Sequence, residues 1–161
     1  MKRIHKIQNH PVYREQYQLL EEAEKDRIFC RHTMEHFLDV ARLMYIYDLE
    51  DGAGIDKELI YAAALLHDIG RYEQIRIGTP HHIAGAKLAG KILGDCEFQQ
   101  EEICKVQEAI AEHRTDHNDA DRHTLAAYLY KADKRSRNCF SCSAYAECNW
   151  PEEKKKRMID E

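Results

Sequence analysis

The sequence predicts an all-α protein, a single helical bundle of about six to seven helices. Three observations favour this fold class. Only three prolines and seven glycines interrupt the 161 residues. No segment alternates apolar and polar residues as a half-buried strand does. Instead, apolar residues recur three, four and seven positions apart, which is the spacing of one helix face.

Individual helices follow from this spacing and from start signals. Asp56 is a plausible N-cap. Thr79 followed by Pro80 indicates another start, because proline suits the first helical position. A loop is expected at 71–80, and a cysteine-bearing loop after residue 136. The expected helices cover residues 11–25, 33–49, 56–69, a stretch from about Pro80, 97–114, 122–136 and a short charged stretch from about Pro151.

Length and composition bound the class of protein. We expect one domain over residues 1–161, with a cysteine-bearing C-terminal segment at 138–161. Apolar content of 43% and charged content of 33% exclude a disordered chain and a membrane-embedded one. The N-terminus lacks the apolar core of a signal peptide, so we expect a cytoplasmic protein with no membrane partner. A net charge of −5 argues against general affinity for nucleic acid.

Four polar side chains continue the apolar faces of four different predicted helices. They are His36, His67, His113 and Asp133. A single histidine on such a face is most often a hydrogen-bonded core residue. Four together are harder to explain in that way, because a buried carboxylate is costly unless a cation or a partner compensates it. Helical bundles build metal sites from facing helices, so the pattern indicates one.

Five short motifs follow one another between residues 28 and 137. They are His36-Phe37-Leu38-Asp39-Val40-Ala41, Leu65-Leu66-His67-Asp68-Ile69-Gly70-Arg71, His81-His82-Ile83-Ala84-Gly85-Ala86, Ala109-Ile110-Ala111-Glu112-His113 and Lys131-Ala132-Asp133-Lys134. In type and order they resemble the HD superfamily of metal-dependent phosphohydrolases, whose signature is His…His-Asp…Asp with additional histidines in two-metal branches. The resemblance implies an HD-domain-like helical bundle.

The resemblance also implies a centre for two divalent transition-metal ions. His36, His67, Asp68 and Asp133 would hold the first ion. Asp68, the catalytic residue, would bridge to a second ion completed by His81 and His113. Histidine with carboxylate ligation suits iron, manganese, cobalt, nickel or zinc. Such ions acidify a water and neutralise phosphoryl charge.

Five further residues are candidates for binding substrate. Arg71 directly follows the central motif, Lys134 follows Asp133 and Arg114 follows His113, so each could meet a phosphate. For each of them, a solvated surface cation is the competing interpretation. His32 competes with His36 as a ligand, but only His36 has the Val-Ala spacing. His82 competes less well with His81, which stands four residues before Gly85.

Departures from the sequence patterns of particular branches limit which branch of the superfamily this chain resembles. Guanosine-tetraphosphate hydrolases follow their His-Asp with Glu-Asp, and deoxynucleotide 5′-nucleotidases carry an acidic residue where this chain has Arg71. The Gly-Tyr-Pro element of cyclic-dinucleotide phosphodiesterases is not found. Among two-metal branches, the bacterial diadenosine tetraphosphate hydrolases are the nearer comparison.

The resemblance therefore implies an enzyme that hydrolyses a phosphoester or phosphoanhydride bond of a small phosphorylated substrate, a nucleotide or dinucleotide. The alternative is a non-catalytic domain that uses the metal centre to bind and sense a nucleotide. A metal-binding adaptor whose cysteine tail contacts a partner is a third possibility. The oligomeric state is left open.

The segment from Cys139 to Cys148 has Cys-x2-Cys-x5-Cys spacing. Such a motif can chelate zinc or an iron–sulfur cluster, although a closed site usually needs four ligands. Cys30, Cys96 or Cys104 could supply the fourth. Alternatively, the three thiols pack a C-terminal cap or form a redox-sensitive tail.

Overall fold

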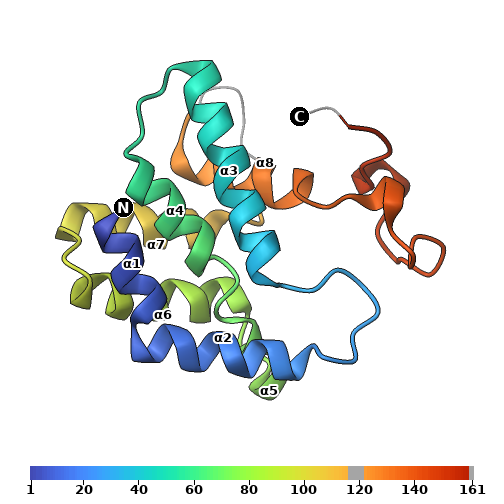
Figure 1. Ribbon diagram of the computed structural model, residues 1–161, viewed down its shortest axis with the longest axis horizontal. Coiled ribbons are helices and arrows are strands. Elements are labelled where there is room, and N and C mark those ends of the chain that lie inside the picture. Colours follow the sequence, from blue (N-terminus) through green and yellow to red (C-terminus); the bar gives the residue numbers. More distant parts are fainter. Residues whose placement is uncertain (116–121, 160–161) are drawn as a thin grey trace.

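The computed structural model describes residues 1–115 and 122–159. Within these ranges the chain forms helices and no β-strand, which confirms the all-α fold class (Figure 1). The α-helices are α1 Lys2–Asn9, α2 Pro11–Ala23, α3 Met34–Asp51, α4 Lys57–Leu66, α5 Arg71–Ile77, α6 His81–Asp95, α7 Gln100–Glu112 and α8 Leu125–Arg135, and the two 3-10 helices are η1 Cys139–Ser141 and η2 Glu152–Lys154.

The core lies where α3, α4, α7 and α8 meet. Helix α3 packs against α4 and α8, and α7 packs against α4, α6 and α8. The apolar face of each helix supplies fully buried side chains, among them Phe37, Met44, Leu65, Ile110 and Leu129. Helices α1 and α2 cover this core from outside, with α1 on α4 and α2 on α5 (Figure 1). None of the described helices combines the length and apolar character that a bilayer span requires.

Two helices differ from the sequence-based expectation. Helix α1 was not predicted, because its eight residues include only two apolar side chains, Ile4 and Ile7, too few to establish a repeating pattern. Helix α5 occupies most of the expected loop at 71–80. It buries no residue, so it lacks the periodic apolar signal on which prediction depends. Gly78, at a φ of 81°, ends it in the left-handed conformation that glycine adopts most readily.

The helix start signals were right in one case and wrong in the other. The Asp56 side chain accepts from the backbone N–H groups of Glu58 at 2.9 Å and Leu59 at 3.2 Å, which confirms the N-cap. Thr79 does not cap α6: Pro80 takes the N-cap position, and the Gln74 side chain accepts from the first N–H, that of His81. The charged helix expected from Pro151 is the single 3-10 turn η2.

Gly70 allows the turn after α4 to lie directly on the start of α6. A Cβ atom at this position would collide with backbone atoms of His81 and Gly85, so the close approach of Asp68 to His81 depends on glycine here. We therefore expect Gly70→Ala to lower the free energy of unfolding by about 1–3 kcal/mol through overpacking, measured by urea denaturation.

Gly94→Ala is the matched control, because an added Cβ there meets no atom within 4 Å. In the last turn of α6, that exchange should leave the protein as stable or slightly more stable. Equal stability of the two variants would contradict the steric role of Gly70.

Candidate metal centre

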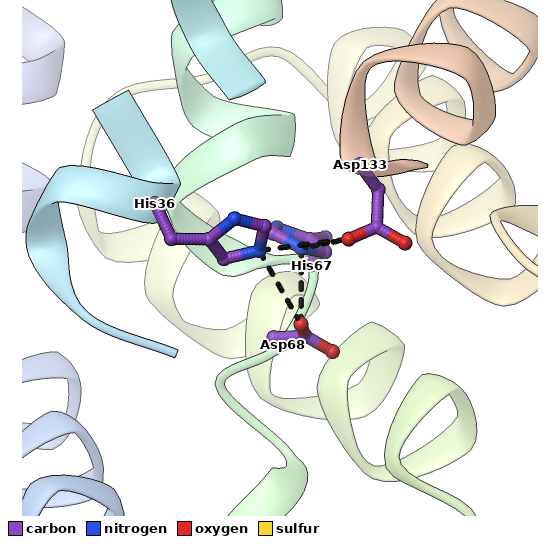
Figure 2. Close-up of side chains that lie close together, drawn as sticks. All are labelled: His36, His67, Asp68 and Asp133. Carbon is purple, nitrogen blue, oxygen red and sulfur yellow. Dashed lines mark ion pairs between the residues drawn. The ribbon is translucent and has the colours of Figure 1, made fainter. Parts of the chain in front are cut away.

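Four of the predicted ligands meet between α3, α4 and α8 (Figure 2). His36 lies in the first turn of α3, His67 and Asp68 directly follow α4, and Asp133 lies near the end of α8. His67 Nε2 is 3.1 Å from Asp68 Oδ2 and 3.7 Å from Asp133 Oδ1. His36 Nε2 is 3.9 Å and 3.5 Å from the same two oxygens. All four ligand atoms lie within 4.8 Å of one another, a spacing that one ion can span.

A second group shares Asp68 and adds two histidines from α6 and α7. His81 is the first residue of α6 and His113 directly follows α7. Their Nε2 atoms lie 3.3 Å and 4.0 Å from Asp68 Oδ1. The two oxygens of Asp68 therefore face different groups, Oδ2 the first and Oδ1 the second. This is the arrangement required of a carboxylate that bridges two ions.

The ends of two helices orient two of the ligands. His67 Nδ1 lies 2.7 Å from the Ala64 carbonyl, and His113 Nδ1 lies 2.6 Å from the Ile110 carbonyl. A carbonyl can only accept, so in each pair Nδ1 carries the proton and donates it. The other ring nitrogen, Nε2, then faces the centre and is the atom that would ligate an ion, as second-sphere contacts arrange in metal sites.

Side chains rather than backbone orient the remaining two histidines. His81 Nδ1 lies 2.6 Å from Gln74 Oε1, an acceptor, so Nε2 again faces the centre. His36 Nδ1 lies 3.1 Å from the Ser136 hydroxyl, and its Nε2 accepts from Arg137 Nη2 at 3.0 Å. An ion bound by His36 would take over this lone pair, so Arg137 would have to release it.

His32 lies closer to the centre than the sequence indicated. It is buried, with Nδ1 2.7 Å from the carboxylate of Glu24 and Nε2 3.4 Å from Asp68 Oδ2. Glu24 is itself 4% exposed and also accepts from the His32 backbone N–H. The carboxylate of Glu24 thus holds one ring nitrogen and directs the other toward Asp68.

Sequence reasoning missed the orienting residues Glu24, Gln74, Ser136 and Arg137. Glu24 ends α2, where a polar residue gives no signal. Gln74 stands seven residues before His81 on the short helix α5, and this helix also escaped prediction. Ser136 and Arg137 follow α8 directly, so their closeness to Asp133 is the one clue the sequence offered.

The buried atoms at the centre fit a cation. His67 Nε2 and Asp68 Oδ2 are both inaccessible to solvent and have no hydrogen-bond partner among the described residues. Buried polar atoms without partners are rare, because each costs the full desolvation free energy. The two atoms lie 3.1 Å apart, and both belong to groups that can ligate a cation. A divalent ion between them would satisfy both.

Electrostatics prepare most of the histidines for ligation. Burial lowers the pKa of His36 to about 4, of His81 to about 3 and of His113 to about 4. All three rings are neutral near pH 7, the state that binds metal. Burial alone would raise the pKa of Asp68 and Asp133, but His67 and other neighbouring cations outweigh it and lower both. Both side chains are therefore carboxylates.

His67 should make ion binding dependent on pH. Burial opposes its charge, but Asp68 and Asp133 outweigh burial and raise the pKa of His67 to about 9 in the ion-free protein. This protonation stabilises the ion-free fold fully below about pH 6.5, the unfolded value, and is lost as pH rises through about 9. Ion binding must displace the same proton. Affinity should therefore increase from pH 6.5 to 8.5, by up to roughly tenfold per pH unit.

The measurement is calorimetric titration of the ion-free protein with Mn²⁺, in buffers of different ionisation enthalpy. We expect release of about one proton per chain near pH 7. An affinity independent of pH, with no proton released, would contradict the assignment of His67 as a ligand.

Of the predicted substrate residues, Arg71 lies nearest the centre. Its Nε donates to Asp68 Oδ1 at 2.9 Å. It lines a pocket of about 360 Å³, to which His32, Asp133 and Arg137 also contribute. The cationic side chains of this pocket lie beside both carboxylates of the centre, where a phosphate could be held.

The other candidates lie less directly at this pocket. Lys134 Nζ is 3.2 Å from Asp133 Oδ2 and packs over the Tyr130 ring. It is not among the residues that line the pocket. Arg114 is exposed beside His113. His82 packs edge-on against the rings of His81 and His113 and stands outside both candidate ligand groups. Its Nδ1 is buried and has no hydrogen-bond partner among the described residues.

Comparison with known proteins agrees with this arrangement. The chain is 44% identical over 136 residues to an uncharacterized protein of Clostridium beijerinckii, with 84% of each chain covered. It is 30% identical over 148 residues to Ribonuclease Y of Clostridium kluyveri, covering 83% of this chain and 28% of that protein. For Ribonuclease Y of Clostridium tetani the identity is 29% over 140 residues, covering 78% and 26%.

The chain thus spans about a quarter of the Ribonuclease Y proteins it matches. No solved structure matches it significantly. Residues 33–138, which contain every member of both candidate ligand groups, match the HD domain family. With this match over most of the chain and its helical fold, the protein belongs to the HD domain family.

Proposed function

We propose that this protein is a metal-dependent phosphohydrolase that binds two divalent transition-metal ions and cleaves a phosphoester or phosphoanhydride bond of a nucleotide or dinucleotide. One observation carries the proposal: the two oxygens of the buried Asp68 face two separate ligand groups. A site for one ion, or a purely structural site, does not require one carboxylate to face two ligand groups.

The roles of the residues follow from their contacts. His36, His67, Asp68 and Asp133 would hold one ion, and Asp68, His81 and His113 the other. Bound ions of this kind acidify a water and stabilise charge on a phosphoryl group. Glu24 accepts from His32 Nδ1, so that His32 Nε2 can accept a hydrogen bond from a water beside Asp68.

Positive charge in the adjoining pocket favours a phosphorylated ligand. Arg71 and Arg137 both line it next to Asp133, and guanidinium groups pair well with phosphate oxygens. The resemblance to diadenosine tetraphosphate hydrolases makes dinucleoside polyphosphates the first substrates to test. Nucleoside mono-, di- and triphosphates are the next substrates to test.

The similarity to Ribonuclease Y favours a second candidate substrate, RNA, whose phosphodiester bonds would be cleaved. The net charge of −5 argues against it. Moreover, the chain covers only 28% of the Clostridium kluyveri protein, so the activity named for that whole protein need not be the activity of this chain.

A substrate screen with added manganese, iron or cobalt tests the proposal. The panel holds dinucleoside polyphosphates, nucleotides, cyclic dinucleotides and a short RNA, and phosphate release or chain cleavage is measured. Turnover of any small nucleotide supports the proposal, and cleavage of RNA alone supports the second candidate. Metal-dependent binding of nucleotides without turnover would instead favour a sensing domain.

Arg71 provides a more specific test of phosphate binding. We expect Arg71→Ala to raise the Michaelis constant about tenfold, with a smaller effect on the turnover number, because a charged hydrogen bond to phosphate contributes about 1.5–3 kcal/mol. Arg76→Ala, on the exposed last turn of α5, is the control and should change neither constant. An unchanged Michaelis constant in Arg71→Ala would remove this role.

A further inference from the structure

Four cysteines from two separate parts of the sequence line one pocket. Cys139, Cys142 and Cys148 come from the C-terminal segment, and Cys30 comes from the loop between α2 and α3. All four are free thiols and all four line the pocket of about 360 Å³. Of the three cysteines that could have supplied a fourth ligand, the fold selects Cys30. Cys96 is buried at the end of α6 and Cys104 is exposed on α7.

The loop that carries Cys30 and the C-terminal segment are held side by side. Arg137 Nη1 donates to the Arg31 carbonyl at 2.9 Å. Residues on both sides of that contact, Phe29 and Ala144 among them, line a further shallow pocket. In Figure 1 the C-terminal segment extends beyond α8, away from the helical core.

The C-terminal segment has almost no apolar core of its own. Among residues 138–159 the buried apolar side chains are Cys139 and Ala144, whereas Phe140, Met158 and Ile159 are exposed. Successive turns link the cysteines: the Cys142 N–H donates to the Cys139 carbonyl and the Tyr145 N–H to the Cys142 carbonyl. So small a core rarely stabilises a defined fold, and natural segments of this kind are commonly fixed by disulfides or a metal.

The spacing of the sulfurs favours a cluster over a single zinc ion. Tetrahedral zinc with Zn–S bonds of about 2.3 Å holds its sulfurs about 3.8 Å apart. In the part of the chain that the structure describes, only the two histidine–aspartate groups have all ligand atoms within 4.8 Å of one another. No three of the four cysteine sulfurs are that close together. Cysteines that bind different irons of one cluster stand farther apart than the ligands of a single ion.

The surrounding charges are suited to thiolate ligands. Arg27, Arg137 and Lys155 line the same pocket. Their positive charges would offset the negative charge of a thiolate-ligated cluster, which burial would otherwise make costly.

We propose that Cys30, Cys139, Cys142 and Cys148 ligate a [4Fe–4S] cluster that fastens the C-terminal segment to the loop before α3. The cluster site adjoins the candidate metal centre, because His32, Arg71 and Asp133 line the same pocket. Its role is structural: it forms one wall of the pocket. This site does not depend on the proposed hydrolase activity.

Acid-labile sulfide is the decisive measurement, since the histidine–aspartate centre contains none. The full chain would be purified without oxygen and reconstituted with ferrous iron and sulfide. We expect about four sulfide ions per chain, together with visible absorption that dithionite bleaches. Absence of sulfide after reconstitution would overturn the proposal, as would one zinc ion per chain bound in its place.

Serine variants assign the ligands. Cys30→Ser and Cys148→Ser should lower sulfide to background, while Cys96→Ser and Cys104→Ser should retain the wild-type content. Circular dichroism monitors the helices, none of which contains Cys30 or Cys148. Full sulfide in Cys30→Ser would overturn the four-cysteine assignment. If variants fail to fold, the sulfide content of the wild-type chain still decides.

An Asp68→Asn variant separates this site from the proposed function. It should keep its sulfide while losing the ions of the histidine–aspartate centre. Loss of sulfide in this folded variant would show that the two sites are not separate and would contradict the proposal.

Discussion

Asp68→Asn should reduce hydrolysis by roughly a thousandfold or more and should empty both ion sites. Asp68 is 1% exposed, and its two oxygens face different ligand groups. Asparagine has nearly the same shape, so it leaves no cavity, but it offers one neutral oxygen and an N–H₂ group that repels a cation. The bridge between the two groups is therefore lost while the packing around it is kept.

Ions per chain, turnover and circular dichroism are measured on the same preparation. Asp39→Asn is the matched control, since Asp39 lies on the outer face of α3 and pairs only with Arg42 among the described contacts. The control should retain the ions and the wild-type rate. A folded Asp68→Asn protein that keeps both ions, or turns over within twofold of wild type, would disprove the bridging role.

The residues that meet at the candidate metal centre could be predicted because they stand in short sequence motifs. His36, His81 and Asp133 stand at fixed positions in short motifs, and the helical period places each on an inward face. Helix ends were less predictable: His67 was expected within a helix, yet it follows the last residue of α4. At this position after the helix, His67 Nδ1 donates to the Ala64 carbonyl. The spacing of apolar residues does not predict this hydrogen bond.

The supporting residues could not be predicted, for a physical reason. Glu24 and Gln74 act through contacts with His32 and His81 that the tertiary fold creates, and neither lies in a motif. The same holds for Cys30. Spacing alone left Cys30, Cys96 and Cys104 as equivalent partners for the Cys-x2-Cys-x5-Cys segment, and only the path of the loop before α3 distinguishes them.

The second ligand group can be tested separately from the first. We expect His113→Gln to lower the ion content from two per chain to one and to reduce turnover about a hundredfold. His113 belongs to the group of Asp68 and His81 and not to the group around His36. Its Nε2 lies 3.2 Å from His81 Nε2, so its loss leaves the second ion only two protein ligands. The first ion keeps all four.

His123→Gln supplies the control for this exchange. His123 is half-exposed and pairs with Asp51 at 3.1 Å, at the other end of α8 from Asp133. That variant should keep both ions and full turnover. If His113→Gln also keeps both ions, the second group is not a metal site. If it loses both, the two sites do not fill independently. Loss of one ion alone would establish that Asp68 serves two separable sites, which is the central requirement of a two-metal mechanism.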